Sequence, residues 1–202
     1  GIGSLGDAIG QALIVRDRHS AEYRHILESL CPDGLAGREL GRFDTGLYGC
    51  SEMFVNAFLR LIEAGIIRRE VFDDAVLQQL LNSGRIQDDC VSADMLRALL
   101  EAGRIRSPLV QEDVTFLKRF GILRHEVQLH AQQLSFESHR CGTDLDDKAN
   151  FECIGSHMLG SRLMHGVFMT GGFFLGPRDF YDRLRSMAPQ DLVKIDMTRI
   201  DF

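Results

Sequence analysis

The amino-acid sequence predicts an α/β fold with a mostly parallel sheet and a helical insertion. Strand-like runs at 44–52 and 167–175 are each followed by an amphipathic helical pattern, and strands that alternate with helices favour a parallel sheet. Between these runs, leucine-rich helical turns are interrupted by glycines. We therefore expect an α/β part over 1–70 and 141–202, with a helical insertion over 71–140.

Composition and charge limit the classes of protein to consider. The chain has 202 residues, of which 45% are hydrophobic, enough for the core of one domain with a small annex. A net charge of -6 argues against general nucleic-acid binding, which needs a basic face. No apolar run approaches the roughly 20 residues that cross a bilayer, and no signal peptide is visible. We expect a cytoplasmic protein with no membrane partner.

The cysteines and histidines do not form a recognisable ligand pattern. The cysteines are odd in number, and none of them forms a Cys-x-x-Cys pair, which indicates reduced, unpaired thiols in the cytosol. His125 and His130 are too far apart for a His-Glu-x-x-His motif, and His157 and His165 lack companion ligands at obvious spacings. We expect no metal and no bound cofactor. The cysteines are Cys31, Cys50, Cys90, Cys141 and Cys153.

The first elements are a glycine turn and two helices. Residues 1–6 formally match Gly-x-Gly-x-x-Gly and precede an amphipathic helix over about 7–15. A dinucleotide site would need a strand before this turn, so the glycines favour a turn at which the backbone approaches another group closely. A second helix over 19–30 is expected to end at 32–34, Pro-Asp-Gly.

Glu52 is the candidate catalytic residue. The strand-like run ends here, and we expect Ser51 to be the N-cap of the following helix, with Glu52 at its first position. The helix dipole would favour an ionised carboxylate there, and such a carboxylate can act as a nucleophile. The structural alternative is an acid that only stabilises the first turn. The apolar face of this helix comprises Phe54, Phe58, Leu61 and Ile62.

A glycine-stopped helical pattern repeats from residue 60 onward. Its glycines, which lie 19, 19 and 18 residues apart, are Gly65, Gly84, Gly103 and Gly121. Each predicts the C-cap of one short helix. The period is shorter than that of ordinary two-helix repeats, so we expect a small helical bundle, with helical pattern continuing through Leu134.

The last third of the chain predicts two further strands and two helices. Asp146 or Asp147 is expected to cap a helix that carries Phe151 and Ile154. The near-continuous apolar run 167–175 predicts a buried strand, with Phe173 and Phe174 in the core. Pro177 is expected to begin the next helix. That helix leads to a final strand over 192–197.

Three segments, in this order, resemble the C-terminal catalytic half of the acetyl-CoA hydrolase/transferase family, the family I CoA-transferases. The resemblance covers 1–70 and 165–202. It implies a sheet of CoA-transferase type. The segments are the Gly-Ile-Gly loop before Asp7-Ala8, the run Tyr48–Phe54 with its helix to Ile67, and the run Gly172–Gly176 with Phe180-Tyr181 and Ile195–Met197.

The resemblance implies an acyl-CoA:carboxylate CoA-transferase or acetyl-CoA hydrolase. Glu52 matches the family's glutamate, which attacks an acyl-CoA thioester and then forms a glutamyl-CoA thioester. Coenzyme A is then a substrate, a small carboxylic acid is the acceptor, and water on an intermediate gives hydrolysis. The candidate substrate- and CoA-binding residues are Gly1, Gly3, Gly172 and Gly176, of which the last two could instead only bracket a core strand.

Parts of the family's pattern are missing from the chain. A Gly-x-Gly-Gly stretch should follow the last strand, and both ends look cut, so we expect a fragment that lacks the N-terminal half and part of the family's site. Paired subunits are also expected. Two alternatives stay open: an interaction module with an exposed apolar groove at 70–140, and a dinucleotide-binding half-domain at the first glycines.

Overall fold

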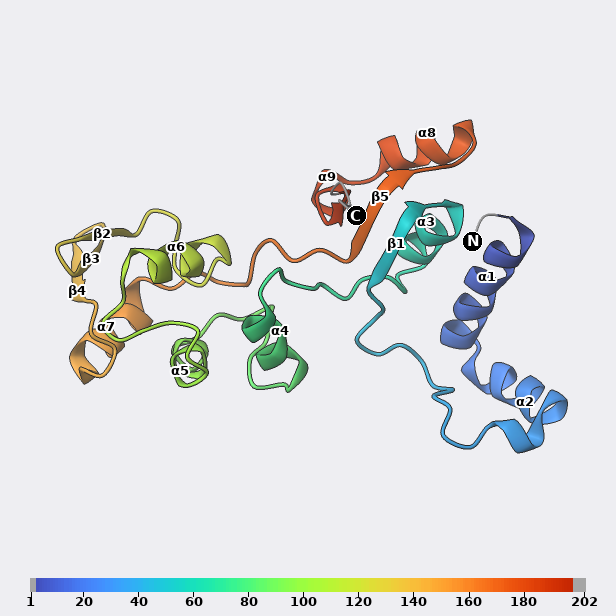
Figure 1. Cartoon of the computed structure of the whole chain (residues 1–202), viewed down its shortest axis with the longest axis horizontal. Coiled ribbons are helices and arrows are strands. Elements are labelled where there is room, and N and C mark those ends of the chain that lie inside the picture. Colours follow the sequence, from blue (N-terminus) through green and yellow to red (C-terminus); the bar gives the residue numbers. More distant parts are fainter. Residues whose placement is uncertain (1–2, 198–202) are drawn as a thin grey trace. The chain divides into compact units, whose positions relative to one another are not determined.

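The computed structural model describes residues 3–197, which divide into two compact units. Unit 1 combines 3–71 with 167–197, and unit 2 is the continuous segment 72–166. Figure 1 shows the elements of both units along the chain. The predicted insertion ended at 140, whereas the structure assigns 141–166 to unit 2 as well.

The sheet of unit 1 has three parallel strands in the order β1-β5-β6. These strands are β1 (Gly49–Phe54), β5 (Met169–Phe174) and β6 (Ile195–Asp196). Helices α8 (Arg178–Ser186) and α9 (Pro189–Leu192) separate β5 from β6, so the predicted alternation of strands and helices is confirmed here. The final strand is shorter than predicted because residues 189–192 form a helix, with a proline in its first turn.

The predicted helices of the N-terminal region are confirmed as α1 (Ser4–Arg18) and α2 (Ser20–Leu30), with the short 3-10 helix η1 at Pro32–Gly34. Helix α1 packs closely on α3 (Asn56–Glu63). The contact is close at Gly10, where an added Cβ would lie 3.4 Å from the Cβ of Ala57. The core of unit 1 consists of Phe54, Leu59, Leu61, Ile66, Ile67, Phe168, Met169, Phe180, Leu184 and Ile195.

Unit 2 contains four helices and a three-stranded antiparallel sheet among its described elements. The prediction of a mostly parallel sheet is therefore wrong for the chain as a whole. The helices are α4 (Ala75–Asn82), α5 (Ala93–Glu101), α6 (Gln111–Arg119) and α7 (Lys148–His157). The strands are β2 (Gln128–His130), β3 (Gln133–Phe136) and β4 (His139–Gly142), in that order across the sheet.

The predicted helix through Leu134 is wrong, because Leu129 and Leu134 face each other across the β2–β3 hairpin. Ala131 and Gln132, the two turn residues, have φ values of 46° and 60°. Positive φ at both central residues matches the turn whose twist suits a two-residue hairpin. Val127 and Leu134 are seven residues apart, a spacing that fits one face of a helix, so the turn is what decides this segment.

The glycine stops are confirmed. Helices α3, α4, α5 and α6 are followed by glycines with φ of 71°, 69°, 69° and 70°, at Gly65, Gly84, Gly103 and Gly121. After α6, for example, the N–H of Ile122 donates to the carbonyl of Leu117 at 2.8 Å. This bond closes a Schellman-type helix end, which needs a left-handed residue.

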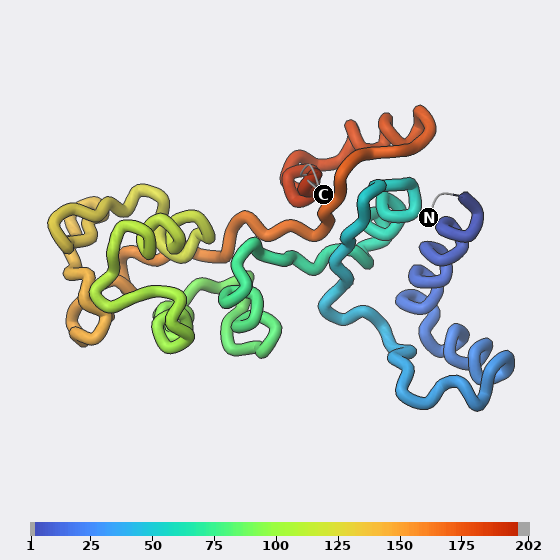
Figure 2. The backbone as a smooth tube through the Cα atoms, in the orientation of Figure 1, coloured from blue at the N-terminus to red at the C-terminus, as the bar shows by residue number. Residues whose placement is uncertain are grey.

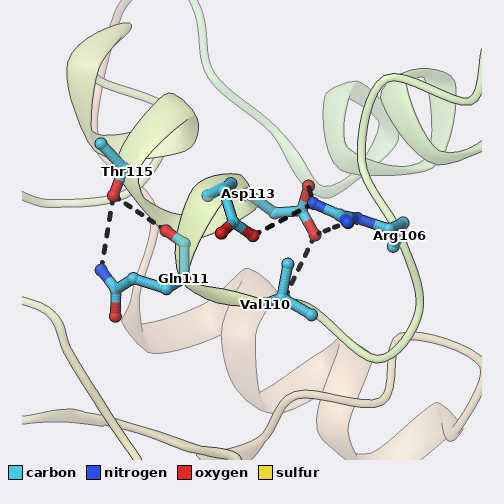
Figure 3. Close-up of polar contacts among 6 residues, drawn as sticks. Arg106, Val110, Gln111, Asp113 and Thr115 are labelled. Carbon is cyan, nitrogen blue, oxygen red and sulfur yellow. Dashed lines mark hydrogen bonds and ion pairs between the residues drawn. The ribbon is translucent and has the colours of Figure 1, made fainter.

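The buried Asp113 fixes the first turn of α6 (Figure 3). Its carboxylate accepts the backbone N–H of Val110 at 3.1 Å and Nε of Arg106 at 3.2 Å. Asp113 and Thr143 are the buried polar side chains of the described residues, and the carboxylate is paired as burial requires. Asp147 similarly caps α7 by accepting the N–H of Asn150 at 2.9 Å, as predicted.

The chain leaves unit 1 after Val71 and returns to it at Val167. The backbone N–H of each residue donates to the carbonyl of the other, at 2.8 and 2.9 Å. Figure 2 shows the backbone path in which these two stretches lie side by side. This antiparallel bridge holds together the two ends of the segment that forms unit 2.

Candidate functional site

Glu52 lies within strand β1, not at the start of a helix. Its neighbour Ser51, the predicted N-cap, pairs with Gly171 of β5, and α3 begins only at Asn56. The prediction of Glu52 at the first helical position is therefore wrong. Pairing with a strand from far along the chain outweighs the local helix-start signal, so the helix dipole does not account for an ionised carboxylate here.

The register of the sheet places Glu52 opposite Gly172. The pairs on either side are Ser51 with Gly171 and Met53 with Phe173. Because strand residues alternate between faces, Glu52 and Gly172 share one face of the sheet. Gly172 has no side chain, so β5 places no side-chain atoms beside the carboxylate at this register position.

The Glu52 side chain is exposed, and within residues 3–197 it makes no hydrogen bond or ion pair. Such a carboxylate is free to accept a ligand, and no contact within the described chain orients it. A nucleophile also needs neighbouring donors for the developing negative charge. The other residues on this face therefore decide what the site can do.

Four residues that were not predicted as site residues share this face. Tyr48 and Cys50 precede Glu52 at alternate positions, and the hydroxyl of Tyr48 donates to that of Thr170 at 2.6 Å. Thr170 also pairs in register with Asp196, whose side chain is exposed. The alternation of positions 48, 50 and 52 was the sequence signal that could have found the first two. Together they form a polar face with two carboxylates, a thiol and two hydroxyls.

The four candidate glycines do not converge in one described site. Gly1 lies outside the described residues. Gly3 precedes α1 with φ of 103°, and a Cβ there would meet nothing within 4 Å. A Cβ on Gly176 would lie 2.4 Å from the ring of Phe180, which gives this glycine a packing role. Only Gly172 is placed beside Glu52.

The aromatic pair after Gly172 differs from its predicted burial. Phe174 is half-buried and lies against Phe54, with ring centroids 5.3 Å apart. Phe173 is 44% exposed, so its prediction as a core residue is wrong. The alternation of the strand explains the difference, because consecutive residues point to opposite faces and only one aromatic can join the Phe54 cluster.

Three cavities among the described residues lie on unit 2. One, of about 500 Å³, is lined by Arg124, Glu126, Gln128, Ser135, Phe136, Glu137 and Arg140. Two smaller ones, of about 320 and 330 Å³, adjoin α6 and the 160–165 segment. Glu52 lines none of these three. Among the described residues, Met164 is the large exposed apolar side chain of unit 2. Those of unit 1 are Leu5, Ile9, Ile26, Leu30, Phe173, Leu175, Leu192 and Val193.

Residues 3–197 contain neither a cluster of metal ligands nor a membrane-spanning helix. No group of three or more His, Cys, Asp or Glu side chains is arranged to hold a metal ion. No helix in that range has the length and apolarity needed to cross a bilayer. Comparison of the chain with protein-family models, curated proteins and solved structures gave no match. A function is therefore argued from the geometry around Glu52 and from the resemblance of the sequence segments.

Proposed function

We propose that the chain supplies the carboxylate nucleophile Glu52 to an acyl-CoA:carboxylate CoA-transferase or acyl-CoA hydrolase. The observation that carries the proposal is an exposed carboxylate, free of partners in the described chain, beside Gly172 on a parallel sheet. A thioester could reach that carboxylate without displacing an ion pair. The described parts of the three sequence segments that resemble the CoA-transferase family belong to unit 1.

In the proposed reaction, a carboxylate oxygen of Glu52 attacks the thioester carbonyl and the C–S bond breaks, giving a mixed acyl–glutamyl anhydride and CoA thiolate. The thiolate then attacks the glutamyl carbonyl and releases the acyl group as a carboxylate. The resulting glutamyl-CoA thioester transfers CoA to an incoming carboxylic acid through a second anhydride. Water that attacks an intermediate instead gives net hydrolysis.

Transfer without hydrolysis requires the Glu52 face to be covered during the reaction, because an exposed anhydride reacts with water. We propose that a further segment of the natural protein, its N-terminal half, or a second subunit provides this cover. The candidate glycines Gly3 and Gly172 would then allow CoA or the acyl group to approach the backbone closely. The reaction is proposed for the cytoplasm.

The decisive experiment uses the natural protein that carries this chain. Incubation with acetyl-CoA followed by peptide mass spectrometry should find a CoA thioester on Glu52. Glu52→Gln should lose both the adduct and turnover. Asp196→Asn is the matched control, because Asp196 is another exposed carboxylate on the same face. Turnover that persists in Glu52→Gln, with no adduct on any carboxylate, would refute the proposal.

A further inference from the structure

Strand β4 and helix α7 are joined at three positions in unit 2. The N–H of Gly142 donates to Oδ1 of Asn150 at 2.9 Å. Next along the strand, Cys141 forms a disulfide with Cys153, and their Cα atoms lie 5.8 Å apart. Beyond it, the rings of His139 and His157 stack with centroids 3.8 Å apart and planes within 15°. The prediction that all cysteines are unpaired is therefore wrong.

The spacing along each element explains why these side chains meet. His139 and Cys141 are two apart on a strand, so they share one face. Cys153 and His157 are four apart on a helix, so they are neighbours on its surface. Two sulfurs and two imidazoles therefore occupy one seam between β4 and α7. We call these four residues the β4–α7 cluster.

One polar atom of the cluster lacks a partner. Nδ1 of His139 is the buried side-chain nitrogen or oxygen that has no hydrogen bond among the described residues. A buried polar atom normally has a partner, so an exception needs an explanation. An imidazole nitrogen that faces no donor or acceptor is also what a metal ligand looks like before the metal binds.

We propose that the reduced β4–α7 cluster binds one Zn²⁺ through both sulfurs and both imidazoles. Two thiolates with two imidazoles are a common tetrahedral zinc ligand set. In the oxidised chain both sulfurs are held in the disulfide, so they become available as ligands only after the bond is reduced. The disulfide is then the metal-free, oxidised form of the site.

The proposed exchange begins with reduction of the disulfide. A dithiol reductant gives two electrons to the Cys141–Cys153 bond, which breaks to two thiols while the dithiol becomes a disulfide. Zinc then displaces one proton from each thiol and forms two Zn–S and two Zn–N bonds. Both protons go to solvent. A disulfide oxidant reverses the exchange: it takes two electrons from the two thiolates and two protons from solvent to become two thiols, while the Cys141–Cys153 bond re-forms and Zn²⁺ is released.

The sequence does not reveal this site because its four ligands form two pairs, one on β4 and one on α7. Each pair is closely spaced, but the two pairs lie apart in the sequence. Cys153 and His157 have three residues between them, and their companions stand 12 and 18 residues earlier, respectively. A scan for a motif on one helix does not connect the pairs. Only the packing of α7 on β4 brings the two pairs together.

Cobalt substitution tests the proposal with the complete chain. After reduction and removal of reductant under anaerobic conditions, Co²⁺ should give the visible bands of a tetrahedral ion and thiolate charge-transfer bands, saturating at one equivalent. Zn²⁺ should displace it and abolish the bands. The oxidised chain should give neither signal. A reduced chain that shows no tetrahedral cobalt spectrum overturns the proposal.

Matched variants identify the ligands. Cys153→Ser and His157→Gln should each weaken Zn²⁺ binding at least tenfold in competition with a chromophoric chelator. Cys90→Ser and His125→Gln alter an exposed thiol and an exposed imidazole of the same unit and should bind as the parent does. Circular dichroism confirms that each variant is folded. Equal loss of binding in the control variants, or full binding in both cluster variants, contradicts the assignment.

Discussion

The hydroxyl of Tyr48 donates a 2.6 Å hydrogen bond to the hydroxyl of Thr170, which stands 122 residues later in the chain. The bond lies on the same face of the sheet as Glu52 and fastens the start of β1 to β5. It couples two sequence-distant residues directly, so its contribution can be isolated by mutation.

Removal of the Tyr48 hydroxyl should destabilise unit 1. We expect Tyr48→Phe to lower the free energy of unfolding by about 1 kcal/mol, because a partly buried hydrogen bond is lost. Urea unfolding of Tyr48→Phe, Thr170→Val and the double variant measures the coupling. Tyr23→Phe, in α2, is the control. Strict additivity of the two single changes would show that the bond contributes nothing.

The glycine stop after α5 should not tolerate a side chain. Gly103 has φ of 69° and nothing within 4 Å of a built Cβ, so only the backbone conformation opposes substitution. We expect Gly103→Ala to cost about 1–2 kcal/mol of stability, and Gly103→Asn to cost less. Gly41→Ala, which has open space and no positive φ, should be close to neutral. Chemical denaturation of the three variants distinguishes strain from loss of flexibility.

The buried Asp113 should be essential to the start of α6. Asp113→Ala leaves the N–H of Val110 and the guanidinium of Arg106 without their acceptor, which should cost about 1–3 kcal/mol. The adjacent Glu112, whose side chain is 78% exposed, also pairs with Arg106. Glu112→Gln should change stability by less than about 1 kcal/mol, as exposed pairs do. Equal effects in thermal unfolding would contradict the capping role.

A hydrogen bond from Ser107 should set the acidity of Asp144. The Ser107 hydroxyl donates to Asp144 at 2.8 Å, and this bond, helped by the N–H of Asp146, holds the Asp144 pKa below its ordinary value. Because the folded pKa is lowered, the stabilisation is present above about pH 4, the ordinary range of an aspartate. It is lost as the pH falls through the folded pKa.

Ser107→Ala should raise the pKa of Asp144 towards its ordinary value, as followed by carboxyl-carbon NMR titration. Ser156→Ala, at an exposed position of α7, is the control and should leave the titration unchanged. An Asp144 titration that is the same in Ser107→Ala and the parent would show that the serine does not control it.

Thiol labelling should distinguish the cysteines. Cys31, Cys50 and Cys90 are free and exposed, whereas Cys141 and Cys153 are bonded to each other. Under denaturing conditions without reductant, three cysteines should react with a maleimide; after reduction, all five should react. Intact-mass spectrometry counts the labels. Five labels without reductant would mean that the disulfide is absent.

The sequence predicted the elements whose signals are local. The glycine stops and the Asp147 cap each depend on residues within one helical turn, and the structure confirms them. The predictions that failed depend on distant partners. The residues around Glu52 were predicted to start a helix. They form a strand because they pair with β5, which lies more than a hundred residues away and gives no local signal. The β2–β3 hairpin was predicted as helix because Val127 and Leu134 are seven residues apart, as on one face of a helix.

The candidate site was predictable only in part. Glu52 and Gly172 were chosen as single residues, but their placement side by side follows from strand register, which the sequence does not encode locally. Tyr48, Thr170 and Asp196 join them for the same reason. The disulfide was not predicted because the odd number of cysteines was taken to indicate unpaired thiols. Five cysteines can still contain one bonded pair.

The pairing of β1 with β5 has a consequence for synthesis of the protein on the ribosome. The segment 72–166 is continuous, so it can complete its own core as soon as it has emerged. Strand β1 emerges earlier but must wait for β5, and until then its backbone edge is unpaired and the Phe54 ring lacks its contact with Phe174. A nascent chain that is stalled after residue 166 has left the ribosome, but before β5 has done so, should therefore hold a folded second unit and an unpaired strand that a chaperone could recognise.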